Sequence, residues 1–496
     1  MSDWIDEEFG AVRLGDQRLN ERLRRLLMRK WENPQRSLSA GCQGRAEVEA
    51  ASRFFDNPKA NLDKILAPHR AATLARIRQG GYRRILLVQD TSECDYTTHP
   101  ALQGAGPLSS QDRRGFFTHN LLVVTPERVP LGLWHTFIFA RDDAEHGKAA
   151  TRKERPIEQK ESFRWIEGYR EACALASLLP ECEVLCLADR ESDIYELFVE
   201  YGQRRAQGLP VAELLIRSNQ DRCLEPFETE AATAAEPGPP PPAPKKIRAR
   251  LAAAPGLGHV AFDVPAATRL KKTKGKCPKP VHRSARHVEQ EVRAVPIRLK
   301  PPWRSPAAGG ALPAVELWVV EARESQPPAG EEPLVWVLLT TLPVATSAQA
   351  VELLELYLCR WEIELLHRML KSGCHVEEIQ LRFDFRLEPA IGLYLIVAWR
   401  LLYVLHLGRV CPDLPCAVLF EECEWKPVVV VLKGHAALQH PPSVGEMVRL
   451  IAQLGGHLAR KNDPPPGMKC FWQGMMCVTH FALCWKSFGE RAPDTS

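Results

Sequence analysis

The stretch that decides the fold is Tyr357-Leu-Cys-Arg360-Trp-Glu-Ile-Glu364-Leu-Leu-His-Arg-Met-Leu-Lys371. Residues 351–371 contain no proline or glycine, and Leu, Glu, Arg and Met dominate, so the sequence predicts one long helix. At about 100° per residue, Arg360, Glu364 and Lys371 fall within roughly 60° of the tyrosine around the helix axis. One carboxylate, two cations and a phenol therefore share one stripe of an otherwise apolar helix. A helix edge with salt bridges gives the same pattern, so this stretch alone does not distinguish a functional stripe from a structural one.

The composition is that of an ordinary soluble globular chain. Its 496 residues are 45% hydrophobic and 25% charged, and the net charge of +4 permits nucleic-acid binding without requiring it. The N-terminus lacks a signal-peptide pattern, and fifteen cysteines are an odd number, so we expect reduced thiols in a cytoplasmic protein. The most apolar run, Ile391 to Leu407, is short for a membrane span and contains Arg400, which favours a buried core helix and no membrane contact.

Residues 1–70 are predicted to form a helical, basic domain. A basic run follows Asp16, which can cap a helix that ends before Asn33-Pro34, and a second helical run spans 45–55. Basic amphipathic helices are often only a solvated face, and they are also typical of DNA-binding modules.

Strand and helix signals then alternate. After a helix at 62–79, an apolar run ending in Asp90 predicts a buried strand, and two more strands follow at 118–124 and 131–140. A helix at 161–178 leads to a strand at 184–188 that ends in Asp189 and is followed by a helix, and a fifth strand lies near 214–218. This order is that of a ribonuclease-H-like mixed-sheet core that still lacks its final helix.

The chain is interrupted before that helix arrives. Residues 236–244 form a stiff polyproline segment, and a β-rich insertion covers about 222–345. The predicted strands of the insertion lie at 259–264, 288–299, 314–321 and 334–341, and a very basic loop spans 269–287. The delayed final helix is the one at 351–371.

Asp90, Asp189 and Glu364 occupy positions that converge in a ribonuclease-H-like core. Each acid alone could be a strand-end cap or a salt-bridge partner, but the three together indicate a metal site. Mg²⁺ prefers carboxylate oxygens, and two divalent ions stabilise the attacking and leaving oxygens of phosphodiester cleavage. We therefore predict that these acids hold two Mg²⁺ ions, which Mn²⁺ can replace.

With these motifs in place, the sequence resembles the DDE transposases of the insertion-sequence-four group, which include Tn-five-type transposases. The Tyr-x2-Arg-x3-Glu-x6-Lys signature of that family is met by residues 357–371. Further family-like segments are 14–18 and 53–58 near the N-terminus, 88–91 and 189–194 around the two aspartates, 334–340 in the insertion, and 453–457 with 471–472 near the C-terminus. The chain departs from the family at Phe116-Phe117, where an aromatic pair often includes tryptophan, and in the polyproline segment and the basic loop.

The resemblance implies a three-part organisation: a DNA-end-binding domain at 1–70, a catalytic domain at 71–372 and a helical dimerisation region at 373–496. It implies nicking at transposon ends, hairpin formation and resolution, and strand transfer into target DNA. Tyr357, Arg360 and Lys371 share the stripe of the glutamate and can reach phosphates, and the family implies further DNA contacts from the residues at matching positions, Arg217 and Arg368. Trp336 matches the family's base-stacking residue, with Trp361 and Phe117 as weaker candidates.

The implied partners are double-stranded DNA, as terminal inverted repeats and target, and a second copy of the chain in a DNA-bound homodimer. The implied location is the bacterial nucleoid. One alternative is a descendant that binds DNA ends and dimerises but no longer cuts. A second alternative is a structural or regulatory DNA-binding protein whose acids only cap strands. Metal-dependent cleavage would distinguish an active transposase from both alternatives.

Overall fold

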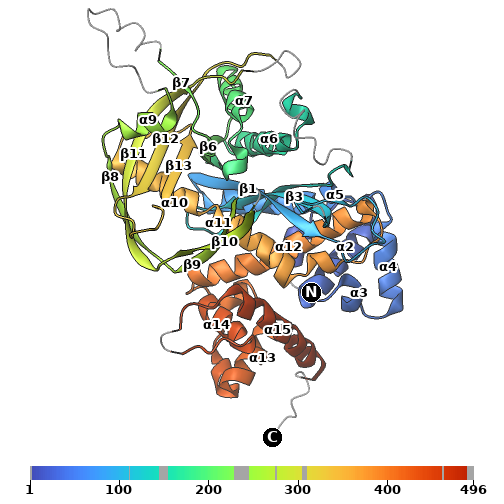
Figure 1. The fold of residues 1–496 in the computed structure, drawn as a ribbon. Coiled ribbons are helices and arrows are strands. Elements are labelled where there is room, and N and C mark those ends of the chain that lie inside the picture. The colour runs from blue at the N-terminus through green and yellow to red at the C-terminus, as the bar shows by residue number, and fades with distance from the viewer. Residues whose placement is uncertain are drawn as a thin grey trace, which may run out of the picture. The chain divides into compact units, whose positions relative to one another are not determined.

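The structure is a computed structural model that describes residues 3–110, 112–143, 155–227, 245–273, 276–303, 310–460 and 463–488. The chain divides into two compact units (Figure 1). The first unit joins two distant parts of the sequence, Met1–Lys148 and Trp361–Ser496, and the second is Ala149–Arg360. The predicted domain boundaries at residues 70 and 372 stay predictions.

The first unit begins with five helices: α1 (Asp3–Phe9), α2 (Gln17–Glu32), α3 (Leu38–Gly41), α4 (Arg45–Phe55) and α5 (Leu62–Gly80). Asp16 caps α2 as predicted, because its carboxylate accepts the Arg18 N–H at 2.8 Å. The apolar face of α2 is buried through Leu23, Leu26 and Leu27. The predicted helices at 45–55 and 62–79 are confirmed.

The strands of the first unit are β1 (Arg84–Asp95), β2 (Gly106–Pro107), β3 (Arg114–Val124) and β4 (Pro130–Phe139), in the order β2-β3-β1 with β4 paired to β3. The β1–β3, β2–β3 and β3–β4 pairs are antiparallel. The prediction that the first strand ends at Asp90 is wrong. Polar residues 91–95 continue the strand because they keep pairing with β3, down to Asp95 opposite Gly115. Asp90 therefore lies in the middle of β1, opposite Asn120.

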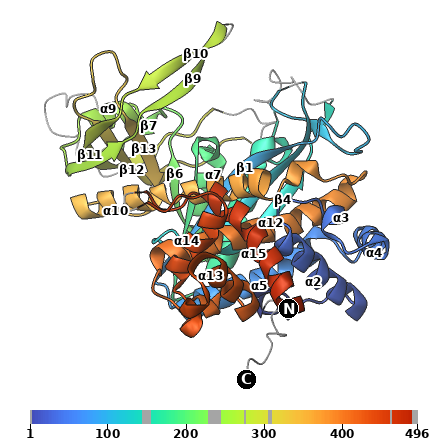
Figure 2. The same cartoon turned by 90° about the horizontal axis from the view of Figure 1, so that it is seen from below.

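The C-terminal part of the first unit is helical, with α12 (Asp384–Val410), α13 (Glu422–Lys433), α14 (Val444–Leu454) and α15 (Met468–Phe488). By length and composition α12 could cross a membrane, but 89% of its most apolar window is buried inside the structure, as expected of a core helix. The Trp399 side chain of α12 donates to the Pro130 carbonyl of β4 at 2.7 Å. Figure 2 shows α13, α14 and α15 packed together.

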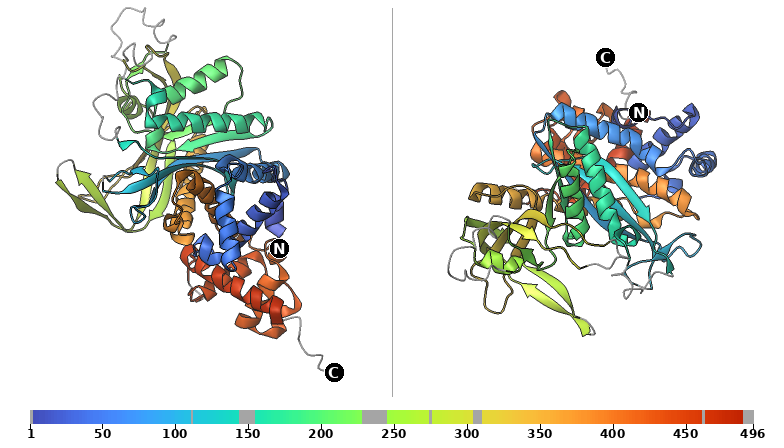
Figure 3. Two further views of the ribbon diagram at one scale, coloured as in Figure 1. Left: turned by 90° about the vertical axis from the view of Figure 1, so that its right-hand side faces the viewer. Right: turned by 90° about the horizontal axis from the view of Figure 1, so that it is seen from above.

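The second unit contains a mixed sheet in the order β5-β6-β13-β12-β11-β7, with β8 also paired to β11. Its strands are β5 (Glu183–Ala188), β6 (Glu213–Arg217), β7 (Leu224–Glu225), β8 (Gly258–Val264), β11 (Arg286–Leu299), β12 (Val315–Glu324) and β13 (Val335–Thr340). β5 and β6 are parallel, and the other pairs are antiparallel. Helices α6 (Arg164–Ser177) and α7 (Tyr195–Ala206) pack on each other, and α6 packs on β5 (Figure 3). Strands, helices and their order agree with the predicted α/β fold and its ribonuclease-H-like core.

The insertion differs from the prediction in one place. The expected basic loop at 269–287 contains an antiparallel hairpin of β9 (Ala267–Thr273) and β10 (Lys276–Arg283), visible in Figure 2. Opposed pairs such as Thr268 with His282 give this segment regular strand pairing despite its charge. The polyproline segment at 236–244 lies outside the described residues.

The predicted single helix at 351–371 is wrong. The structure has α10 (Ser347–Leu358), then α11 (Trp361–Arg368), then a π-helical turn at Met369–Gly373. The α-helical hydrogen-bond pattern is interrupted at Cys359 and Arg360. Their N–H groups donate to carbonyls three residues back, at 3.0 and 3.1 Å, which tightens the chain into a turn. The stripe argued from a continuous helix is therefore split: Tyr357 belongs to α10 in the second unit, and Glu364 belongs to α11 in the first.

Candidate catalytic and DNA-contacting residues

Two of the three predicted metal ligands belong to the first unit. Asp90 lies on β1 and Glu364 on α11, and α11 packs on β1 and β3. The amide of Asn120, opposite Asp90 on β3, is bonded to the His367 ring of α11 at 3.0 Å. This buried bond fixes the helix that carries Glu364 on the strand pair that carries Asp90. Both carboxylates are half-buried, so a ligand can reach them.

The backbone around Asp90 is held from both sides. The Asp90 carboxylate accepts the Thr91 N–H at 2.7 Å. The buried His119 ring links the Thr91 hydroxyl, at 2.8 Å, to the Gln89 amide oxygen, at 3.1 Å. Such bonds to neighbouring groups orient an acid.

Other acids on β1 have structural partners. Glu93 accepts the Ser109 N–H at 2.9 Å and pairs with Arg113. Burial raises the pKa of Glu93, but the bonds to Ser109 and the Arg113 guanidinium outweigh it and lower the pKa overall. Burial also opposes ionisation of Asp95, whose pKa is lowered overall by hydrogen bonds from Thr97. These two carboxylates are therefore tied to the scaffold.

The metal prediction can be compared with the donor atoms that the structure offers. Among the described residues, no three His, Cys, Asp or Glu side chains form a group that could hold a metal ion. Asp90 and Glu364, on packed elements, supply only carboxylate oxygens, which suit Mg²⁺ better than a soft or borderline metal. The donor chemistry thus fits Mg²⁺, and the binding of two ions by three acids stays a prediction.

The third predicted ligand, Asp189, follows β5 in the second unit. Its carboxylate accepts the Glu191 N–H at 2.8 Å and caps a short 3₁₀ turn. Asp193, four residues later, is buried and accepts from the Arg222 guanidinium at 2.8 Å and from the N–H groups of Asn219 and Gln220 at 2.7 and 3.0 Å. Asp193 therefore stabilises the loop after β6. Asp189, by contrast, is only half-buried.

Among the buried polar atoms of the second unit, two at predicted DNA-contact positions have no hydrogen-bond partner in the part of the chain that the structure describes. They are the Tyr357 hydroxyl on α10 and Nε of Arg217 on β6. Burial raises the pKa of Tyr357 to about 12, against the opposing effect of nearby Arg360. Burial, reinforced by the neighbouring Arg190 guanidinium, lowers the pKa of Arg217. A phosphate oxygen would satisfy either group, and the DNA contacts at both positions stay predictions.

Of the predicted aromatic platforms, Trp336 lies against Tyr357. Their rings meet edge to face, with centroids 6.1 Å apart, and Trp336 is half-buried. Phe117 is buried and engaged on its ring by Phe139, 5.3 Å away and nearly parallel, and by Arg141, 4.1 Å from its centroid. Trp361 is 47% exposed. Base stacking by any of them stays a prediction, and Phe117 is the least accessible.

The remaining cations occupy different environments. Arg360 is buried in the turn after α10, and Lys371 lies 3.8 Å from Glu377. Arg368 is exposed at the end of α11 and lines a pocket of about 450 Å³ in the first unit. Residues 35, 372, 375, 469, 472 and 473 also line this pocket.

Sequence reasoning missed the role of Lys30. It counts among the basic residues of α2, yet it is buried, and its ammonium group donates to the carbonyls of Arg36 and Cys374, both at 2.8 Å. It also lies 3.7 Å from the Tyr394 ring centroid, and burial lowers its pKa to about 8. Lys30 thus ties the N-terminal helices to the turn that follows Lys371. Its place on the apolar face of α2 was the available signal.

Two protein-family models match this chain, one near each end of the sequence. Residues 1–60 match the model described as "Transposase DNA-binding", and residues 396–488 match the "Transposase Tn5 dimerisation domain". The first match covers helices α1 to α4, and the second covers most of α12 and all of α13 to α15.

The two matches define the class of protein: this chain is a transposase, with a DNA-binding domain at one end and a dimerisation domain at the other. Within that class it is a Tn5-like transposase. It accordingly binds DNA and forms homodimers.

Proposed function

We propose that this chain is a metal-dependent cut-and-paste transposase whose Asp90, Asp189 and Glu364 form one active site. The observation that carries the proposal is the combination of the two transposase domains at the termini with acids on β1, after β5 and on α11. Those are the positions at which a ribonuclease-H-like core places its metal ligands. The bond between Asn120 and His367 supports it, because it fixes α11 on the strand pair of Asp90.

In this proposal the three carboxylates hold two Mg²⁺ ions. When bound, the ions would activate a water or a 3′-hydroxyl and stabilise the charge that develops on the phosphate. The positions of Asp90 on β1 and Glu364 on α11 support this role, and the bonds of Thr91 and His119 hold the strand. The proposed order of events is nicking at the transposon end, hairpin formation and resolution, and strand transfer into target DNA.

The proposal also assigns the predicted DNA contacts. Tyr357 and Arg217 would each give an unpartnered buried atom to a phosphate, and Arg360, Arg368 and Lys371 would add cationic contacts. Trp336 would stack on a base that leaves the helix during hairpin formation. The terminal inverted repeats would be bound by residues 1–60, largely through phosphates and hence with strong salt dependence.

The proposal is tested by separating binding from cutting. Glu364→Gln removes the charge of the proposed ligand and keeps its shape, so cleavage of DNA carrying the native flanks of the gene should fall by at least about 10³-fold in Mg²⁺. Binding of the same DNA in EDTA should be unchanged. Glu355→Gln is the matched control, because Glu355 is an exposed glutamate of α10.

Equal cleavage by Glu364→Gln and wild type would refute the active-site assignment. End binding by a wild-type protein that never cuts, with Mg²⁺ or Mn²⁺, would instead identify a non-catalytic end-binding descendant.

A further inference from the structure

We propose that an arginine-lined pocket in the second unit holds a backbone phosphate of DNA without reading its sequence. The pocket has a volume of about 290 Å³. It is formed by the start of the 3₁₀ turn after β5, the loop after β6, the start of α9 (Ile247–Ala252) and strands β12 and β13. Its lining residues are Arg190, Ser218, Asn219, Gln220, Asp221, Ile247, Arg248, Arg323, Val335 and Val337.

The sheet register separates this pocket from the face that carries Trp336. Arg323 on β12 is directly opposite Val335 on β13, so the two side chains share one face, and Val337 joins them two residues on. Trp336 lies between the two valines and points to the other face, where it meets Tyr357. The pocket lining therefore contains none of the predicted DNA contacts, and Arg190 is the lining residue that also lies near one of them, Arg217.

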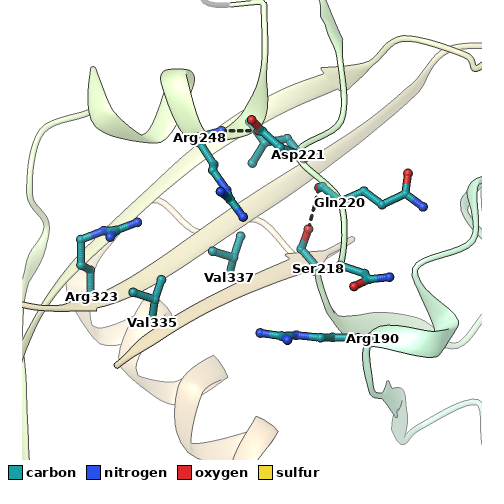
Figure 4. A pocket seen from close by; sticks show the side chains of 10 residues that line it. Arg190, Ser218, Gln220, Asp221, Arg248, Arg323, Val335 and Val337 are labelled. Carbon is teal, nitrogen blue, oxygen red and sulfur yellow. Dashed lines mark hydrogen bonds between the residues drawn. The ribbon is translucent and has the colours of Figure 1, made fainter. Parts of the chain in front are cut away.

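The pocket lining is mainly basic: it contains three arginines and one acidic residue, Asp221. Figure 4 shows Arg190 and Arg248 reaching in from opposite sides above and below the two valines, with Arg323 at the edge. In the described part of the chain, no ion pair or hydrogen bond engages the side chains of Arg190 and Arg248, and both residues are exposed. The Asp221 carboxylate already accepts the Arg248 N–H at 2.9 Å. Unpaired arginines that face one cavity are suited to an anion with several oxygens.

The rest of the lining selects the backbone of a nucleic acid rather than its bases. No aromatic residue lines the pocket among the described residues, so it offers no stacking platform for a base. Arg323 is also anchored, since its guanidinium pairs with the buried Glu321 at 2.8 Å and is held in place for a ligand. Phosphate contacts of this kind position DNA and carry no sequence information.

This inference rests on the proposed function only in that the bound phosphate belongs to DNA, and it can be tested without cleavage. Full-length protein would be titrated in EDTA with a labelled duplex that lacks the flanks of the gene, at several NaCl concentrations. Arg248→Gln should weaken binding roughly three- to tenfold and lower the slope of log K against log salt by about 1. Arg248→Lys, which keeps the charge, should recover most of the slope.

The matched control is Arg205→Gln, an exposed arginine of α7 that does not line the pocket; its slope should equal that of wild type. The double variant Arg190→Gln/Arg248→Gln should lower the slope by about 2. Wild-type slopes for Arg248→Gln and the double variant, at unchanged melting temperatures, would overturn the proposal. Binding of ATP by the wild type but not by Arg248→Gln, with equal duplex binding by the two proteins, would overturn the proposal in favour of a free-nucleotide site. A protein that fails to cut DNA but shows the expected slopes would refute the proposed catalysis and leave this site standing.

Discussion

At the scale of single residues, carboxylates of the same type have different roles because their surroundings differ. Asp193 is buried and receives three hydrogen bonds, whereas Asp189, four residues earlier, is half-buried and receives one from the next turn. Both follow the same strand, so their spacing in the sequence could not separate them. Only the fold, which brings Arg222 to Asp193, shows which acid is structural.

This difference predicts opposite phenotypes for two isosteric variants. Asp193→Asn loses its charged bond to Arg222 and should lower the free energy of unfolding by roughly 2 kcal/mol. Asp189→Asn should leave the melting temperature unchanged and abolish metal-dependent cleavage. Thermal melts and cleavage assays on both variants check this. A stable, inactive Asp193→Asn beside an active Asp189→Asn would reverse the assignment.

A second prediction concerns the buried hydroxyl of Tyr357. Because it has no partner in the described residues, Tyr357→Phe should leave the DNA-free protein as stable as wild type, or more stable by up to about 1 kcal/mol. If the hydroxyl binds a phosphate, cleavage of bound DNA should fall by roughly tenfold. Melting curves without DNA and single-turnover cleavage measure the two effects. A destabilised Tyr357→Phe that cuts normally would make the hydroxyl part of the core.

At the scale of elements, strong local signals predicted most helices and strands. The helix at 45–55 was predicted to the residue, and the caps at Asp16 and Asn33 fixed the ends of α2. Predictions failed where longer-range pairing decides. Residues 91–95 are polar, yet they stay in β1 because β3 pairs with them, and the basic segment at 267–283 forms a hairpin for the same reason. No proline or glycine marks the break at Cys359-Arg360, so composition could not reveal it.

The packing of α14 on α15 gives a prediction for the dimerisation domain. A Cβ added at Gly474 would overlap the Ile451 carbonyl oxygen of α14 and approach its side chain at 3.0 Å. Gly474→Ala should therefore separate the helices, lower stability by about 1–3 kcal/mol and weaken the dimer. Gly467→Ala, where an added Cβ meets nothing within 4 Å, is the control and should change stability by less than about 0.5 kcal/mol. Melting curves and sedimentation measure both. Equal behaviour of the two variants would show that this crossing tolerates a methyl group.

At the scale of the whole molecule, the sequence predicted the class of protein and the terminal domains, because the motifs at 14–18, 53–58, 453–457 and 471–472 are local. The candidate site was predictable only in its acids and signature residues. The arginine pocket was not predictable, because Arg190 and Arg323 are 133 residues apart in the sequence and these arginines come together only in the folded second unit. Lys30 was likewise counted as a basic surface residue, although its ammonium group is buried against the carbonyl of Cys374.

The most direct test of the central claim, metal-dependent DNA cleavage by the three acids, is excision from a donor plasmid. Purified protein would receive plasmid DNA with the native flanks of its gene, with and without Mg²⁺, beside an Asp90→Ala variant that still binds those flanks. We predict release of the flanked segment by the wild type in Mg²⁺ only, and none by Asp90→Ala. Excision that proceeds in EDTA, or that survives Asp90→Ala, would contradict the account.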